Sequence, residues 1–206
     1  MSADRGHDDD GETADTADWP VSLSGVTESI VTTLGPNGLW NAAPLGLFAD
    51  GDGDGPITAR TWGKTRTRGN FHRQGEGYVQ FVDDPVVFAD AALSIVEGEE
   101  PILESANAWT RVTVESLESG TDDGTDWERW ALHPVDAEIR RERVPTIDRG
   151  FGAVIEATVA ASRLGVAGYD DADLRERLEY CASVVDRAGS PRERKALERV
   201  REHSNW

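Results

Sequence analysis

Residues 28–49, ESIVTTLGPNGLWNAAPLGLFA, decide the fold class of this chain. The short β-branched run Glu28–Leu34 predicts a strand. Gly35-Pro36-Asn37-Gly38 predicts a tight turn, and Leu39–Ala49 predicts a second strand after it. Strands joined by so short a turn pair antiparallel. The stretch therefore indicates an antiparallel hairpin and not a βαβ unit.

Five more strand segments and two short helices are expected after this hairpin. Alternating or β-branched runs predict the strands, and polar caps predict the helix starts. Asp84 followed by Pro85 is such a start, and it predicts a helix that runs to about Leu93. The other helix is expected over Thr65–Gln74, and the strands over Ile57–Trp62, Tyr78–Val82, Ala108–Leu117, Asp126–Leu132 and Ala137–Arg143.

The last third of the chain has helical periodicity. Gly150 precedes FGAVIEATVAASRL, a second helix is expected over Ala172–Ala188, and Ser190-Pro191 opens a third. Strands first and helices last predict an α+β fold with an antiparallel barrel or sheet, and not a doubly wound fold. The apolar stripe expected on the first of these helices consists of Phe151, Val154, Ile155, Thr158 and Val159.

The composition excludes several classes of protein. The chain has 206 residues, enough for one large domain, and a single cysteine, which excludes a disulfide framework and a cysteine-rich zinc site. It has neither an apolar run of membrane-spanning length nor the apolar core of a signal peptide. We therefore expect a soluble cytoplasmic protein without a membrane partner. Residues 1–18 are rich in aspartate and predict a disordered acidic tail.

The charge is strongly negative, with a formal net value of −18 and only two lysines, Lys64 and Lys195. An acidic, lysine-poor surface suits a protein that works in molar salt, where screening weakens self-repulsion. The alternative is an acidic protein that docks on basic partners. Either interpretation argues against non-specific binding of nucleic acid.

The basic stretch Ala59–Arg73, ARTWGKTRTRGNFHR, is the exception to this acidity, because it contains five lysine or arginine residues and no acid. It passes from a predicted strand through Gly63 into a helix N-terminus, where free N–H groups and the helix dipole favour a phosphate. Gly63-Lys64-Thr65 is not a P-loop, because Thr58 stands where the first glycine belongs. The alternative is that these arginines form surface ion pairs.

A second unusual segment is Trp40–Gly46, WNAAPLG. Its small residues would let a flat ligand approach the backbone closely, and its proline places it at a strand edge or bulge. A kinked edge strand without any ligand explains the proline equally well.

The succession of ESIVTT, NAAPLG, ART-x-GKTRT-x-x-N, VDDP-x-x-F and RGFGAVIEATVAASR resembles the archaeal DUF447 family of the FMN-binding split-barrel superfamily, which is flavin-reductase-like. The resemblance extends over residues 26–164. It implies a split β-barrel over residues 19–148, a helical C-terminal portion over residues 149–206, and a homodimer with flavin near the subunit interface.

The resemblance also implies a set of cofactor-binding residues. Those for the FMN phosphate are Lys64, Thr65, Arg66 and Thr67, with Asn70 completing the pocket and Arg60 beside it. Those for the isoalloxazine ring are Asn41, Ala42, Ala43 and Pro44, together with the backbone near Thr61 and Trp62.

No catalytic dyad is visible, and none of the four histidines has a partner at metal-ligand spacing, so we expect no metal site. In a flavoprotein the cofactor carries the redox chemistry. We therefore expect an FMN-binding oxidoreductase of the flavin-reductase-like type, with donor and acceptor open. The alternative is a non-catalytic protein that holds FMN, or a deazaflavin coenzyme, as store, sensor or structural ligand. Binding of nucleic acid by the basic stretch ranks last.

Overall fold

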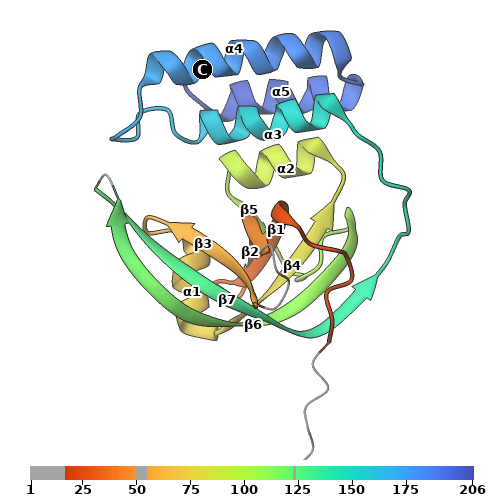
Figure 1. Cartoon of the computed structure of the whole chain (residues 1–206), viewed down its shortest axis with the longest axis vertical. Coiled ribbons are helices and arrows are strands. Elements are labelled where there is room, and N and C mark those ends of the chain that lie inside the picture. Colours follow the sequence, from red (N-terminus) through yellow and green to blue (C-terminus); the bar gives the residue numbers. More distant parts are fainter. Residues whose placement is uncertain (1–16, 50–54, 123) are drawn as a thin grey trace, which may run out of the picture.

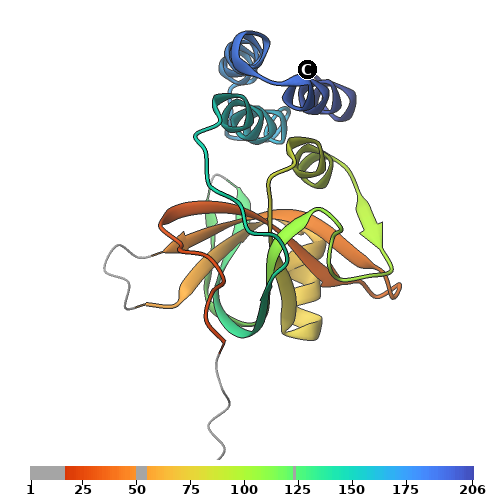
Figure 2. The same cartoon turned by 90° about the vertical axis from the view of Figure 1, so that its right-hand side faces the viewer.

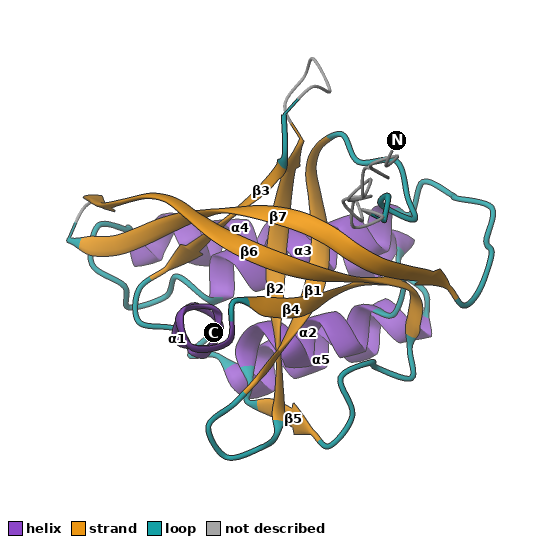
Figure 3. Cartoon of the chain, turned by 90° about the horizontal axis from the view of Figure 1, so that it is seen from below, coloured by secondary structure: helices purple, strands orange, loops and turns teal. Residues whose placement is uncertain are grey.

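The structure is a computed structural model that describes residues 17–49, 55–122 and 124–206. Most of the predicted acidic tail, residues 1–16, lies outside the described residues. Six antiparallel strands form a closed barrel, because β1 pairs with both β4 and β2 (Figures 1 and 3). In barrel order the strands are β1 (Gly25–Leu34), β4 (Glu76–Val82), β6 (Ala106–Asp122), β7 (Thr125–Ile139), β3 (Ile57–Trp62) and β2 (Trp40–Ala49). The predicted α+β class, an antiparallel barrel followed by helices, is confirmed.

Two details of the strand prediction are wrong. Asp126–Leu132 and Ala137–Arg143 were expected as separate strands, but β7 runs without a break to Ile139. Pro134 is accommodated inside β7 because the register with β6 shifts beside it, between Arg111 and Val112, and such irregularities tolerate a missing N–H. Strand β5 (Val96–Gly98), which pairs with the start of β2, was missed because three residues carry no periodic signal.

The barrel interior follows the alternation of the strands. Val31, Leu45 and Leu47 point inward, where Phe71 of the helix α1 (Arg66–Gln74) joins them. Residues of the opposite parity, Ile30 and Ala42, point outward into a separate cluster. The other members of the interior cluster are Ala59, Val79, Val112, Trp130 and Leu132.

Four helices cover one side of the barrel in two layers (Figures 1 and 2). Helix α2 (Pro85–Leu93) lies on the barrel and is capped by Asp84, as predicted. Helices α3 (Arg149–Ala161), α4 (Asp171–Ala188) and α5 (Pro191–His203) pack above it, and α5 has the predicted capping box. No helix in the described part of the chain is long and apolar enough to cross a membrane.

Most of the predicted stripe of α3 is confirmed, because Val154 and Thr158 are buried and Phe151 and Ile155 pack against a core cluster. The prediction left out the alanines that make up much of the buried face. Ala153, Ala157 and Ala160 are buried in the helical core, whereas Phe151 and Ile155 pack toward the barrel. Small side chains let α3 approach the other helices closely. At Gly150 even a Cβ would lie only 2.8 Å from the Cα of Gly189. Helix α3 therefore packs both against the other C-terminal helices and against the cluster that α2 forms with the barrel.

Helix α1 is fixed to the barrel by a buried carboxylate, that of Glu128 on β7. One oxygen accepts hydrogen bonds from Nε of Arg68 at 2.7 Å and Nε2 of His72 at 2.8 Å, and the other accepts from Ser116 Oγ at 2.7 Å. Burial raises the pKa of Glu128, but these hydrogen bonds outweigh burial, so its pKa lies below the ordinary value. The charged form of Glu128 therefore stabilises the fold.

We expect Glu128→Gln to lower the free energy of unfolding at pH 7 by about 1.5–3 kcal/mol, because a hydrogen-bonded buried charge is lost. The Glu128 contribution is complete above the ordinary pKa of 4.5 and is lost as the pH falls through the lower folded-state pKa. The difference in the free energy of unfolding between the wild type and Glu128→Gln should therefore narrow as the pH falls below 4.5. Urea unfolding across the acidic range measures it.

The matched control is Glu118→Gln, since Glu118 forms an exposed ion pair with Arg129 on the same hairpin, at 3.0 Å. This change should cost less than about 1 kcal/mol. Equal losses in the two variants would contradict the role given to Glu128.

Candidate functional site

Strands β2 and β3 form an incomplete ladder. They pair only at Leu47–Ala59 and Phe48–Thr58, and β5 then pairs with β2 over Trp40–Ala42. Between these two contacts, Ala43–Gly46 has no ladder partner on this edge among the described residues, nor does Arg60–Trp62 on its facing edge. Backbone N–H and C=O groups at such edges are available to a ligand. We call this gap the β2–β3 opening.

The N-terminus of α1 lies directly after the free end of β3. Thr65 caps the helix, and its side chain and carbonyl accept the amides of Arg68 and Gly69. An α-helix gives the amides of its first residues, Arg66 and Thr67, no partner of their own. The first turn holds no acid, and Gly63 makes the preceding turn with φ +65°. The geometry suits an anion, as the sequence predicted.

Two cations of the basic stretch are already paired. Arg66 bonds Glu97 of β5 at 2.6 Å, and Arg68 bonds Glu128 at 2.7 Å. The ion-pair alternative therefore applies to these two. Lys64 is exposed and has no carboxylate within 4.0 Å among the described residues, so it is available to a ligand.

The predicted site residues line several hollows rather than one. Pro44, Arg60 and Trp62 line a hollow of about 290 Å³ under α3. Lys64 and Thr65 line one of about 350 Å³ at the start of α1. Asn41, Arg66 and Asn70 line a hollow of about 320 Å³, and Ala42 lines a larger one. Ala43 lies on the free edge of β2.

Five predicted site residues are buried, and the fold uses the side chains of two of them, Thr61 and Asn70. The other three are Asn41, Ala42 and Thr67. Thr61 Oγ1 accepts Nε1 of Trp130 at 3.0 Å inside the barrel, so only its main chain faces the opening. Asn70 donates to Thr33 Oγ1 at 2.9 Å, which holds α1 against β1. The side chain of Thr67 is buried, so only its main-chain amide is left to bind a ligand.

Sequence reasoning missed two carboxylates, Glu97 and Glu128. Glu128 could have been found, because it shares the inward parity of Trp130 and Leu132 on β7 and so had to face a cation. Glu97 gave no signal, because β5 is too short to be recognised.

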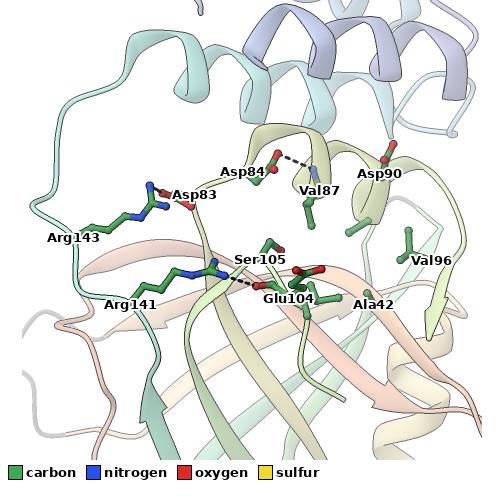
Figure 4. A pocket seen from close by; sticks show the side chains of 12 residues that line it. Ala42, Asp83, Asp84, Val87, Asp90, Val96, Glu104, Ser105, Arg141 and Arg143 are labelled. Carbon is green, nitrogen blue, oxygen red and sulfur yellow. Dashed lines mark hydrogen bonds and ion pairs between the residues drawn. The ribbon is translucent and has the colours of Figure 1, made fainter. Parts of the chain in front are cut away.

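Another hollow, about 570 Å³ between α2 and the barrel, contains one predicted residue, Ala42 (Figure 4). Three of its acids form ion pairs within the fold: Asp83 pairs with Arg143, Asp84 with Arg192 at 2.5 Å, and Asp90 with Arg199 at 2.7 Å. Within the described part of the chain, no three His, Cys, Asp or Glu side chains gather as metal ligands would. We assign this hollow no ligand.

Similar solved structures include an FMN-bound DUF447 protein from Methanosarcina mazei. It is 25% identical, with a TM-score of 0.74, over 88% of this chain and 96% of that one. A flavin reductase complexed with NADP+ is 17% identical, with a TM-score of 0.40, over 58% of this chain and 81% of that one. An FMN-binding protein from Thermus thermophilus is 16% identical, with a TM-score of 0.38, over 68% of this chain and 82% of that one.

Two family models match the sequence in succession. The N-terminal domain of DUF447, a protein of unknown function, matches residues 27–141, which form the barrel. A second DUF447 model, also of unknown function, matches residues 148–202, which form α3 to α5. The chain therefore belongs to the DUF447 family.

Proposed function

We propose that the protein binds FMN at the β2–β3 opening and acts as an oxidoreductase of the flavin-reductase-like type. The observation that carries the proposal is that the free edges of β2 and β3 lie next to the N-terminus of α1, whose first turn holds no acid. The FMN-bound relative from Methanosarcina mazei, which shares the fold at a TM-score of 0.74, supports the choice of ligand.

The residues of the opening fit the parts of FMN. Lys64 and the amides of Arg66 and Thr67 would hold the phosphate, because cations and helix N-termini bind anions. The main chain of Ala43–Pro44 and of Arg60–Trp62 would bond the polar edge of the ring. Bound FMN supplies hydride or single-electron transfer. The protein contributes binding, orientation and exclusion of water by α3, which covers the hollow beside Pro44.

A non-catalytic role, or a deazaflavin in place of FMN, remains the alternative proposal. An anaerobic titration of the flavin-loaded protein, first with a nicotinamide donor and then with a reduced deazaflavin, distinguishes an oxidoreductase from a non-catalytic protein. Bleaching of the flavin band by either donor supports the oxidoreductase. A band that survives both supports a store, sensor or structural ligand.

We further propose a homodimer, which the family resemblance implies. The net charge of −18 leads us to propose a cytoplasm of high salt as the working environment. Screening of self-repulsion should raise the melting temperature by several degrees between about 0.1 M and about 2 M KCl. Differential scanning calorimetry measures it. A melting temperature that stays constant or falls would contradict adaptation to salt.

The phosphate assignment predicts that FMN binds much more tightly than riboflavin, which lacks the phosphate. Each charge-assisted hydrogen bond is typically worth about ten- to a hundredfold in affinity. Replacing both Lys64 and Arg66 by alanine should remove most of the preference for FMN. Fluorescence quenching of each flavin measures the two affinities.

The control for this double variant is Lys195→Ala, because Lys195 lies on α5 and pairs with Glu198. It should leave both affinities unchanged. Equal affinities for FMN and riboflavin in the wild type would contradict the phosphate site.

The ion pair between Arg66 and Glu97 predicts competition between Glu97 and the phosphate. Glu97→Gln should release Arg66 and tighten FMN binding by about two- to fivefold, the range of an exposed ion pair. Glu99→Gln removes the same charge two residues away and should have a smaller effect. If the two variants bind FMN equally well, Arg66 does not contact the phosphate.

A further inference from the structure

Glu28 on β1 places a carboxylate at the β2–β3 opening. In the ladder between β1 and β2 it lies opposite Gly46, the last residue of the free β2 edge. A Cβ at Gly46 would lie 3.7 and 3.9 Å from the two oxygens of this carboxylate. The absence of a larger side chain at Gly46 therefore leaves room for Glu28 over the free edge. Glu28 lines the same hollow of about 290 Å³ as Pro44 and Trp62.

The surroundings of this carboxylate are mostly apolar. Val26 of β1 and Phe88 of α2 line the hollow with it. Glu28 is half-buried, and among the described residues it has no ion pair and no side-chain hydrogen bond, in contrast to Glu97 and Glu128. A half-buried carboxylate without a partner costs free energy, and such groups are typical of functional sites.

The nearest charged group favours a proton on Glu28. Burial and the carboxylate of Glu156 on α3 raise the pKa of Glu28 above its ordinary value. Arg177 of α4 pairs with Glu156 at 3.1 Å, but both side chains are exposed, so solvent weakens this pair. Strand β2 and helix α2 contribute no charged residue to the lining of the hollow.

Two arginines also line the hollow, but their guanidinium groups face aromatic rings. That of Arg60 lies 4.3 Å from the ring centre of Trp127, and that of Arg163 lies 5.1 Å from the ring centre of Tyr169. Neither arginine comes within 4.0 Å of the Glu28 carboxylate. No cation in direct contact therefore competes with the proton on Glu28.

We propose that Glu28 is the proton-carrying residue of the flavin site, which takes up a proton when the bound flavin is reduced. This inference rests on the proposed function. A flavin that gains a hydride from a donor such as a reduced nicotinamide becomes an anion, and its charge repels that of ionised Glu28. Glu28 then binds a proton from the solvent.

The proton on Glu28 is available for the second half of the reaction. A neutral acceptor that is reduced by two electrons takes a hydride from the flavin and a proton from the carboxyl group of Glu28. The flavin returns to its oxidised form and Glu28 to its carboxylate, so that charges and atoms balance. Glu28 thereby couples the transfer of a proton to the transfer of the hydride.

The test measures the midpoint potential of FMN bound to the full-length protein against pH, in the wild type and in Glu28→Gln. At a pH below the pKa of Glu28 its carboxyl group is as neutral as the amide, so the two potentials should coincide. At higher pH the carboxylate opposes the reduced flavin. The wild-type potential should then lie below that of the variant by about 30 mV, which corresponds to a tenfold change in the preference for oxidised FMN.

Infrared difference spectroscopy follows the proton itself. Reduction of the flavin-loaded wild type should produce a carboxyl C=O band that shifts in D2O and is absent from Glu28→Gln. Glu28→Asp keeps the carboxyl group and should keep the pH-dependent part of the potential. The control is Glu76→Gln, because Glu76 lies on β4, pairs with Arg111 at 3.4 Å and does not line the hollow. It should have the wild-type potential at every pH.

Potentials of the wild type and Glu28→Gln that coincide at every pH, or differ by the same amount at every pH, would overturn the proposal. Reduction of the wild type without a carboxyl band would also overturn it, and this result does not depend on any variant. An FMN titration separates the two proposals. If the wild type binds FMN and the potentials coincide throughout, only the role of Glu28 fails. If the wild type binds no FMN, the proposed function fails, and the role of Glu28 fails with it.

Discussion

Strands β2 and β3 pair at only two positions, and the arrangement of the candidate site depends on this constraint. A barrel that closed completely there would have no free backbone edge outside its ends. The gap leaves Ala43–Gly46 and Arg60–Trp62 facing one another. At one end of the gap, β5 and the start of α1 meet through the ion pair of Glu97 and Arg66. The hollow under α3 opens on the same surface.

The barrel core and a buried charge hold α1 at this gap. Phe71 fills the barrel interior, Asn70 bonds β1, and the Glu128 carboxylate accepts Arg68 and His72 from α1 and Ser116 from β6. The helix N-terminus is thus fixed in place before any ligand arrives, which lowers the entropic cost of binding. The same contacts neutralise part of the basic stretch, whereas Lys64 has no carboxylate partner among the described residues.

The sequence was sufficient for the fold class and for most helix starts, because caps, turns and alternation are local signals. Asp84-Pro85 and Ser190-Pro191 predicted two of these starts correctly. It was not sufficient for β5 or for the continuity of β7 through Pro134, since both depend on a neighbouring strand. For the same reason the partners Glu97 and Glu128 were not predicted, although the basic residues they bind were. That Thr61 and Asn70 serve the fold became evident only from their tertiary partners.

The most direct test of the central claim is the position of FMN in a crystal of the flavin-loaded protein. The account predicts a phosphate within hydrogen-bond distance of Lys64 Nζ and of the amides of Arg66 and Thr67, with the ring against the free edge at Ala43–Pro44. A flavin bound in the hollow between α2 and the barrel, or away from the N-terminus of α1, would contradict it.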